Sequence, residues 1–199
     1  MKIYFLRHGV TANNTGYLFQ GQIDTPLSRE GIEQAEKEAV NVANDHLTFD
    51  RIYCSPLDRA IVTCEIVTGK DRSSFVFDKL LMEISYGPYE GKPIMESDSE
   101  MMAFLREPYK YDPPKGVESL QEVGKRMIEA LDQIIGDNPD VNSILISSHG
   151  IALSTLFKKI IDDQQLGLSE KVMARHGKLY VSEYSKGKLS FPQLCFPDE

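Results

Sequence analysis

The chain has 199 residues, of which 41% are hydrophobic and 26% are charged, and its formal net charge at pH 7 is -8. This length and hydrophobic content are enough for one core of ordinary size, so we expect a single domain over residues 1–199. The acidic balance argues against a nucleic acid or an anionic membrane surface as the main partner.

The cysteine pattern and the first residues of the chain indicate in which cellular compartment the protein is expected. Cys54, Cys64 and Cys195 are odd in number and have no CxxC spacing, which indicates buried thiols in a reducing environment. The first residues lack the basic and long apolar parts of a signal peptide, and no apolar run approaches the length of a membrane span. We therefore expect a cytoplasmic protein.

The first predicted element is a buried strand over Ile3 to Leu6, and it ends abruptly at Arg7, His8 and Gly9. In open α/β sheets ligands bind at the carboxyl ends of strands, and a glycine there lets the backbone turn sharply. The residues alone leave three roles open for His8: a nucleophile, a metal ligand or a packed core residue.

A loop, a helix and a second strand follow. Glycines and polar residues indicate a loop over 9–26, where Asn14 favours a turn. Ser28 is typical of an N-cap and precedes an amphipathic helix over 29–44. A short strand over 50–54 leads to Ser55 as the next N-cap, with Pro56 at the first helical position. Arg59 then lies in the first helical turn, where it is either solvated or part of an anion site.

The middle of the chain is harder to interpret. Residues 75–77 predict a third strand, and Glu83 follows in an apolar neighbourhood that would raise its pKa and keep it protonated as a general acid. Composition alone would more often make Glu83 a surface residue. A helix over 97–106 precedes a proline-rich extended path, and five aromatic residues could pack in the core or wall a pocket: Tyr86, Tyr89, Phe104, Tyr109 and Tyr111.

The last third alternates clearly between helices and strands. Ser119 and Glu122 form a predicted capping box that opens a helix to Gly136. A buried strand over 143–147 brings His149 to the same sheet edge as His8, and a helix over 151–161 follows. A strand over 179–184 and a turn at 185–188 lead to a final strand near 189–194.

Several motifs resemble, in order and spacing, the histidine phosphatase family that includes phosphoglycerate mutases, from residue 3 to about residue 184. These are Arg7-His8-Gly9-Val10-Thr11 with Asn14, Gly21-Gln22-Ile23-Asp24-Thr25-Pro26-Leu27, Ser55-Pro56-Leu57-Asp58-Arg59-Ala60, Glu83 and Ser148-His149-Gly150. The resemblance implies an α/β fold, a three-layer α/β/α sandwich with a mostly parallel central sheet, and a variable lid-like segment near 92–118.

The resemblance also implies the roles of site residues. His8 would be the nucleophile, Glu83 the acid, and Arg7, Arg59 and His149 the groups that stabilise the phosphoryl oxygens. Asn14, Gly21 and Gln22 would contact the substrate, and no metal or cofactor would be needed. Ligand spacing for a metal is absent, and the two arginines would repel one.

Two features depart from the family pattern or imitate it. Val10 stands where a glutamate often follows the glycine. Arg175-His176-Gly177 repeats the opening tripeptide but precedes a strand, so we expect no catalytic role for His176. The region around this tripeptide also lacks an asparagine often found there, which leaves the details of pocket specificity open.

The favoured function is a phosphomonoesterase acting on a small phosphorylated metabolite, with a small-molecule phosphate ester as partner. A phosphoglycerate mutase is the first alternative, although such mutases are generally longer in the part that corresponds to 92–118. A non-catalytic module that binds a phosphorylated ligand is the second. The sequence leaves open whether the chain forms a homo-oligomer.

Overall fold

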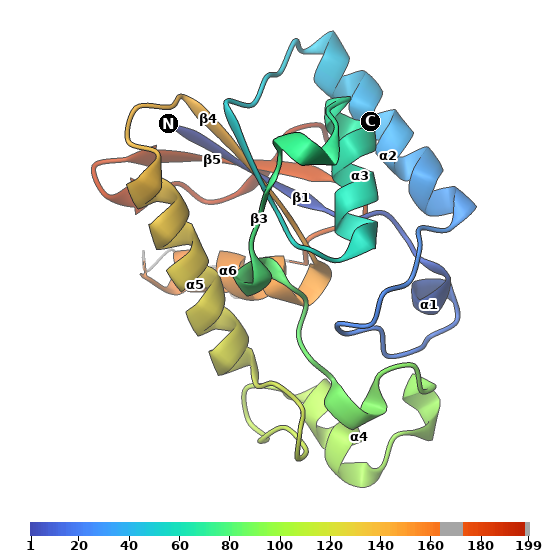
Figure 1. Cartoon of the computed structure of the whole chain (residues 1–199). Coiled ribbons are helices and arrows are strands. Elements are labelled where there is room, and N and C mark those ends of the chain that lie inside the picture. Colours follow the sequence, from blue (N-terminus) through green and yellow to red (C-terminus); the bar gives the residue numbers. More distant parts are fainter. Residues whose placement is uncertain (164–172, 198–199) are drawn as a thin grey trace.

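The computed structural model describes residues 1–163 and 173–197, and within these ranges seven strands form one sheet (Figure 1). The order across the sheet is β3-β2-β4-β1-β5-β6, with β7 paired to β5. Their bounds are β1 (Lys2–Arg7), β2 (Arg51–Cys54), β3 (Val76–Phe77), β4 (Ser143–Ser148), β5 (Leu179–Ser185), β6 (Lys188–Leu189) and β7 (Gln193–Leu194). Strands β3, β2, β4 and β1 are parallel, and β5 runs antiparallel to β1.

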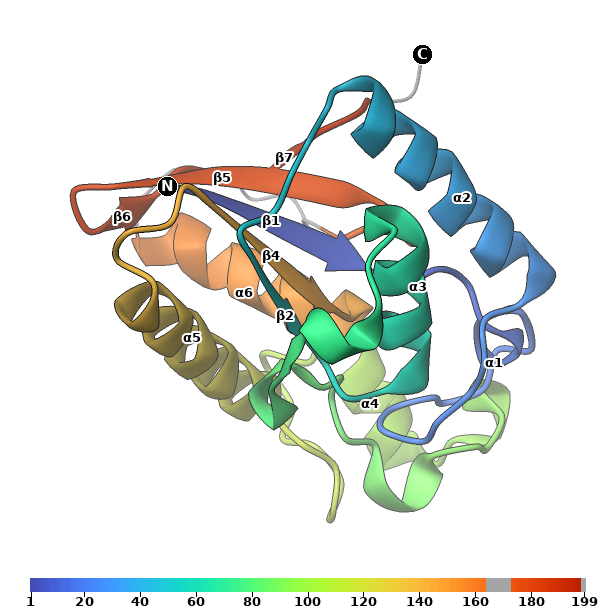
Figure 2. The same ribbon diagram turned by 45° about the horizontal axis from the view of Figure 1, so that its top comes forward.

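Helices cover both faces of the sheet. The α-helices are α1 (Ala12–Thr15), α2 (Arg29–Asn44), α3 (Asp58–Thr68), α4 (Ser99–Arg106), α5 (Leu120–Asp137) and α6 (Gly150–Asp163). Four short 3-10 turns lie between α3 and α4: η1 (Arg72–Ser74), η2 (Lys79–Leu81), η3 (Gly87–Tyr89) and η4 (Ile94–Glu96). Helices α2 and α3 pack on one face of the sheet, and α5 and α6 pack on the other (Figures 1 and 2).

The alternation of side chains along β1 explains the three layers. Ile3 and Phe5 belong to the core that α5 and α6 complete, whereas Tyr4 and Leu6 belong to the core under α2 and α3. Successive residues of a strand point to opposite faces, so a strand that is apolar throughout must be covered on both sides. The predicted three-layer fold with a mostly parallel sheet is confirmed.

Capping residues fix the ends of the two long helices as predicted. The Ser28 side chain accepts a hydrogen bond from the Gly31 N–H, and α2 spans the predicted residues. Ser119 and Glu122 form the reciprocal capping box at the start of α5.

Three local predictions were wrong. Helix α3 begins at Asp58 after Leu57, which gives no side-chain cap, because Ser55 still belongs to the sheet edge through a Ser55 N–H bond to Ser147 O of 2.9 Å. The loop over 9–26 contains the short helix α1. The final strand is two short strands, β6 and β7, and each pairs with β5.

The carboxyl ends of the parallel strands β1, β2 and β4 meet at one edge of the sheet. Here the His8 N–H donates to Ser148 O at 3.2 Å, so the ends of β1 and β4 are side by side. The loop after α1 and the segment before α4 lie close together near this edge (Figures 1 and 2), joined by backbone bonds from Phe19 N to Lys92 O of 3.0 Å and from Ile94 N to Tyr17 O of 2.9 Å. The loop after α1 and the segment before α4, which are distant in sequence, therefore lie together beside the carboxyl ends of the parallel strands.

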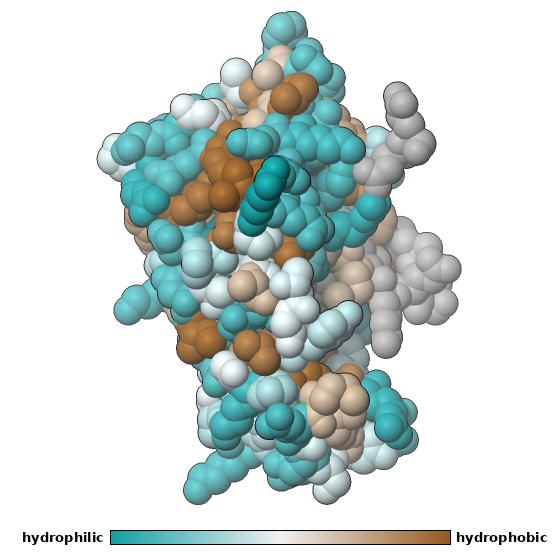
Figure 3. All heavy atoms as spheres, turned by 90° about the vertical axis from the view of Figure 1, so that its right-hand side faces the viewer, coloured by the Kyte–Doolittle hydropathy of each residue, from teal (hydrophilic) through white to brown (hydrophobic). Residues whose placement is uncertain are grey.

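The molecular surface is mainly polar on the face seen in Figure 3, where hydrophobic side chains gather in separate patches between hydrophilic ones. Of the helices in the described ranges, none combines the length and the apolar character needed to cross a membrane.

Candidate active site

A cavity of about 200 Å³ opens at the carboxyl edge of the sheet. It brings together residues from β1, the loop after α1, α3, the segment after η2, α4 and the start of α6. Its lining residues are Arg7, His8, Asn14, Leu18, Phe19, Gln20, Gly21, Arg59, Glu83, Tyr86, Ile94, Leu105, Gly150, Ile151 and Met173. Six of the eight residues singled out from the sequence are in this list.

His8 is held in a single tautomer. It is buried, and its Nδ1 lies 2.7 Å from the Gly9 carbonyl oxygen. A carbonyl oxygen can only accept, so Nδ1 carries the hydrogen, and in the neutral ring Nε2 keeps a free electron pair. Burial, and then the charges of Arg59 and Arg7, lower the pKa of His8 well below its usual value. His8 is therefore a neutral imidazole beside two cations.

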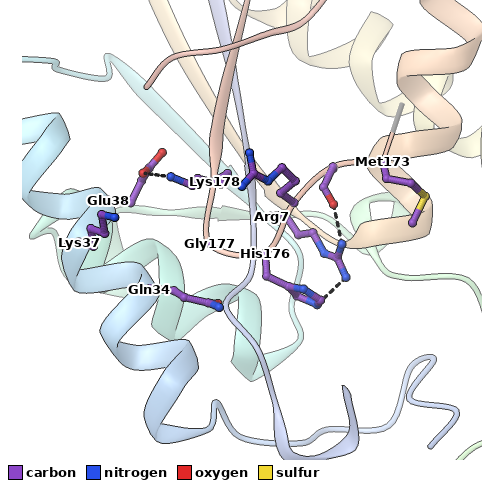
Figure 4. A pocket seen from close by; sticks show the side chains of 10 residues that line it. Arg7, Gln34, Lys37, Glu38, Met173, His176, Gly177 and Lys178 are labelled. Atoms are coloured by element: carbon purple, nitrogen blue, oxygen red, sulfur yellow. Dashed lines mark hydrogen bonds and ion pairs between the residues drawn. The ribbon is translucent and has the colours of Figure 1, made fainter. Parts of the chain in front are cut away.

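Arg7 is oriented by the turn that precedes β5 (Figure 4). Its Nη1 donates to the Ala174 carbonyl oxygen at 2.5 Å, and its Nη2 lies 2.5 Å from His176 Nε2. The guanidinium group always donates, so His176 Nε2 must accept and the ring must be neutral. Burial, followed by the charge of Arg7, lowers the pKa of His176 to about 4.

His176 is the residue whose place the sequence interpretation missed. Its ring centroid lies 5.7 Å from that of His8, and the Gly177 N–H donates to both Arg7 O and His8 O at 3.1 and 3.2 Å. The sequence predicts no catalytic role for His176, because the repeated tripeptide Arg175-His176-Gly177 precedes a strand. However, β5 runs antiparallel to β1, so the start of β5 lies at the same edge as the end of β1. An antiparallel β5, if it had been predicted, would have placed His176 next to His8.

Arg59 joins the start of α3 to the loop that follows α1. It is only 1% exposed, and its Nη1 and Nη2 donate to Ile23 O at 2.9 Å and to Gly21 O at 2.6 Å. Gly21 has a φ of +54°, which favours glycine, and a Cβ there would meet the Glu90 side chain unless that side chain moved. The sequence allowed an exposed arginine, whereas the structure buries Arg59 in the wall of the cavity.

His149 lies behind His8. The two ring centroids are 5.1 Å apart, His149 is fully buried, and its Nε2 lies 2.7 Å from Ser55 Oγ. In the tautomer that accepts from the Ser55 hydroxyl, Nδ1 carries a hydrogen and has no partner in the protein. Burial, and then the nearby positive charges, of which Arg59 acts most strongly, lower the pKa of His149 well below its usual value.

The surroundings of Glu83 differ from the apolar neighbourhood expected from the sequence. Its Oε1 accepts from the N–H groups of Ile84 and Ala152 at 3.0 Å each, and its Oε2 accepts from the Ile151 N–H at 3.1 Å. Two of these donors belong to the first turn of α6. These three backbone donors hold the Glu83 carboxyl group at the N-terminus of α6.

The remaining predicted contacts divide into two groups. Asn14 and Gly21 line the cavity, and because Asn14 Oδ1 accepts from the Thr11 N–H at 3.0 Å, the amide nitrogen of Asn14 is the group that can reach a ligand. Gln22 does not line the cavity, since its amide donates to the Glu83 carbonyl oxygen at 3.0 Å. The neighbouring Gln20 takes that place: its Oε1 accepts from Thr11 Oγ1 at 2.9 Å, which turns its NH₂ group away from Thr11.

Four buried nitrogen atoms around the cavity have no hydrogen-bond partner. They are Arg7 Nε, Gln20 Nε2, Arg59 Nε and His149 Nδ1, and among the described residues only one other buried side-chain atom, Ser182 Oγ, shares this condition. Buried polar groups in native proteins are almost always paired, so donors without a protein partner beside a cavity are suited to bind a ligand. Four donors and two positive charges suit an anion with several oxygens.

Two further observations define the surroundings. A second cavity of about 470 Å³, whose lining residues are drawn in Figure 4, shares Arg7 and Met173 with the first. Within 1–163 and 173–197, no three histidine, cysteine, aspartate or glutamate side chains converge in a way that could hold a metal ion.

Comparison with known proteins agrees with this arrangement. The family model of the histidine phosphatase superfamily (branch 1) matches residues 3–195. A relative named "Probable phosphoglycerate mutase GpmB", from Yersinia pestis, is 33% identical over 165 residues, which cover 81% of this chain and 75% of the relative.

Two solved structures share the fold. YhfR of Bacillus stearothermophilus has a TM-score of 0.83 at 28% identity, covering 96% of this chain and 94% of that one. The alpha-ribazole phosphatase of Shigella flexneri has a TM-score of 0.80 at 24% identity, covering 98% and 96%. Since the family model spans nearly the whole chain, and Arg7, His8 and Arg59 line one cavity with His149 packed against His8, this protein belongs to the histidine phosphatase superfamily, branch 1.

Proposed function

We propose that this protein is a phosphomonoesterase that hydrolyses a small phosphorylated metabolite through a phosphohistidine at His8. The observation that supports this most directly is the tautomer of His8: Nδ1 is occupied by the Gly9 carbonyl oxygen, which leaves Nε2 as a nucleophile beside Arg7 and Arg59. The unpaired donors around it match the oxygens of a phosphoryl group.

In the first step, His8 Nε2 attacks phosphorus, the P–N bond forms and the P–O bond to the leaving group breaks. Arg7 and Arg59 donate through their Nε atoms to the phosphoryl oxygens, and the Asn14 and Gln20 amides and His149 Nδ1 supply further donors. Placing these donors in advance stabilises the charge that develops in the transition state.

Glu83 carries the proton in this scheme. Its Oε2 accepts one N–H, so this oxygen has room for a proton, and the dianionic substrate nearby favours its uptake. Protonated Glu83 gives the proton to the departing alkoxide. In the second step, ionised Glu83 removes a proton from water, which attacks phosphorus and releases inorganic phosphate and neutral His8.

The covalent intermediate provides the first test. After mixing with ³²P-labelled 4-nitrophenyl phosphate and rapid acid-free quenching, label should be found on His8, and His8→Ala should lose both the label and turnover. Label on another residue, or full turnover in His8→Ala, would contradict the proposal. Retained binding of inorganic phosphate by His8→Ala, measured by calorimetry, would show that the cavity remains folded.

Glu83→Gln tests the acid separately. Gln keeps an oxygen that accepts backbone N–H groups but cannot transfer a proton. Hydrolysis of a poor leaving group such as an alkyl phosphate should fall by about 10²-fold or more, while 4-nitrophenyl phosphate should be affected much less. Equal losses for the two esters would remove Glu83 from this role.

Mutase activity is the second candidate, because a 33% identical relative carries a phosphoglycerate mutase name. A mutase must keep the phosphoryl group on histidine until it is returned to the substrate. An assay for interconversion of phosphoglycerates, with and without a bisphosphoglycerate primer, distinguishes the two activities: we expect release of inorganic phosphate without interconversion.

We further propose a small-molecule phosphate ester as the partner and the cytoplasm as the site of action. The three cysteines are unpaired, which fits a reducing compartment. Cys195 is only partly buried, in contrast to Cys54 and Cys64.

A further inference from the structure

The cavity has two chemically different sides. One side carries the phosphoryl-binding groups already described. The other, which we call the apolar wall, consists of Leu18, Phe19, Tyr86, Ile94, Leu105, Ile151 and Met173. If a phosphoryl group occupies the first side, the leaving group of the ester must lie against the apolar wall.

The positive charges of the cavity are already committed. Among its described lining residues, Arg7 and Arg59 are the cations. Each of their Nη atoms donates one hydrogen bond to a protein group, which holds both guanidinium groups in place, and their buried Nε atoms are available to the phosphoryl oxygens. A carboxylate or a second phosphate on the leaving group would meet apolar side chains, and burying an unpaired anion is costly.

The apolar wall also offers a flat surface. Phe19 and Tyr86 pack with ring centroids 4.9 Å apart. Burial, and then the charge of Glu83, raise the pKa of Tyr86 above its usual value, so its hydroxyl stays neutral. A flat or branched uncharged group can pack on this pair, with the Tyr86 hydroxyl as a neutral hydrogen-bonding group.

The segment before and within α4 completes the wall from the opposite direction. Helix α4 buries Met101 and Phe104 in the core that also contains α5 and α6, so its position is fixed by packing. Leu105 follows Phe104 and turns to the cavity, and Ile94 of η4 joins it. Two residues of the segment 92–118, Ile94 and Leu105, thus line the part of the cavity that would hold the leaving group.

We propose that the substrate is a monoester of an uncharged, mainly apolar alcohol or phenol, and that Ile94 and Leu105 select against leaving groups with a second anionic group. This inference rests on the proposed function and narrows its substrate class. It excludes phosphoglycerates as good substrates, because each retains a carboxylate next to the ester.

Two matched esters test the inference: 4-methylbenzyl phosphate and 4-carboxybenzyl phosphate, which differ mainly in charge. We expect kcat/KM to be about 100-fold higher for the methyl ester, the discrimination that an unpaired charge at the wall should give. Equal values for the two esters would overturn the inference and leave the phosphatase proposal intact. Failure to hydrolyse either ester or 4-nitrophenyl phosphate would overturn both.

Leu105→Lys supplies the missing cation and should reduce the preference to about tenfold or less by raising kcat/KM for the carboxylate ester. Leu105→Met, which changes shape without charge, should keep the preference. Ile94→Lys is a second position for the same test should Leu105→Lys lower the melting temperature strongly. An unchanged preference in a folded lysine variant at both positions would contradict the assignment of the wall.

Discussion

At the scale of single residues, the site works by fixing which nitrogen of each imidazole carries hydrogen. His8 must donate from Nδ1 because Gly9 O can only accept, and His176 must accept at Nε2 because Arg7 can only donate. Neutral imidazoles are favoured because both rings lie in a buried region already occupied by guanidinium charges. The arginines therefore add to the effect of burial in keeping His8 neutral, and in the proposed mechanism they also bind the phosphoryl oxygens.

His176→Ala should weaken phosphate binding by about tenfold, corresponding to about 1.5 kcal/mol for a lost hydrogen bond to a charged group. Arg7 would lose the acceptor that aims its Nε, so KM should rise more than kcat falls. His176→Gln, whose side-chain oxygen can accept from Arg7 Nη2, should recover most of the affinity. Calorimetry with inorganic phosphate measures this effect.

His46→Asn is the matched control for removing a histidine. His46 is exposed after α2 and has a φ of 52°, which asparagine tolerates. The His46→Asn variant should bind inorganic phosphate with the same affinity as the unchanged protein. Equal affinity in His176→Ala would mean that the Ala174 carbonyl oxygen alone positions Arg7.

At the scale of elements, Arg126 of α5 fastens the segment that carries Glu83. Its Nη1 donates to Leu80 O and Met82 O at 2.8 and 2.6 Å, and its Nη2 donates to Glu83 O at 3.1 Å. Glu118 accepts from Arg126 Nε at 2.7 Å and also from the Ser85 N–H at 3.0 Å. The ion pair between Arg126 and Glu118 therefore connects helix α5 to the segment 80–85, which contains Glu83.

Arg126→Met should lower the free energy of unfolding by about 2 kcal/mol. This loss is smaller than the loss expected on breaking a fully buried ion pair, because the side chains of Arg126 and Glu118 are partly exposed. It should also slow poor leaving groups more than 4-nitrophenyl phosphate, since Glu83 loses its support. Urea denaturation and the two-ester assay measure these effects. The double variant Glu118→Gln, Arg126→Met should be less destabilised than the single one, because no charge is left unpaired; additive losses would argue against a paired role.

Elements with strong local signals could be predicted, and those set by distant contacts could not. The N-cap at Ser28, the capping box at Ser119 and the apolar patterns placed α2, α5, β1 and β4 closely. Helix α3 begins later than predicted because Ser55 is held by residues far along the chain: its N–H donates to Ser147 O, and its hydroxyl contacts His149, 94 residues away. Likewise, two of the three donors to Glu83 come from α6, and the partners of Arg7 come from the turn before β5. Such contacts depend on strand order and direction, which short sequence windows do not contain.

At the scale of the whole molecule, the acidic chain concentrates positive charge and neutral imidazole in one region. Three of the four histidines, His8, His149 and His176, lie around the cavity, and burial lowers the pKa of each. Each ring would have to take up a proton against nearby arginine charge. The pH dependence of folding should therefore report on this region.

Stability should fall as the pH decreases from about 7 to about 5. In the unfolded chain these histidines titrate near pH 6.5, whereas in the folded protein they stay neutral to lower pH, for His176 to about 4. Within this window the unfolded state binds more protons, so acid favours unfolding, with a slope of at most about 1.4 kcal/mol per pH unit for each histidine. Carboxylates with lowered pKa values, such as Asp50 and Asp98, act in the same direction but at lower pH.

Urea denaturation between pH 5.5 and 7.5 measures the slope of the free energy of unfolding with pH, and His176→Gln should make this slope shallower. A free energy of unfolding that stays constant or rises on acidification would mean that the imidazoles take up protons in the folded protein, and the neutral nucleophile would then have to be abandoned.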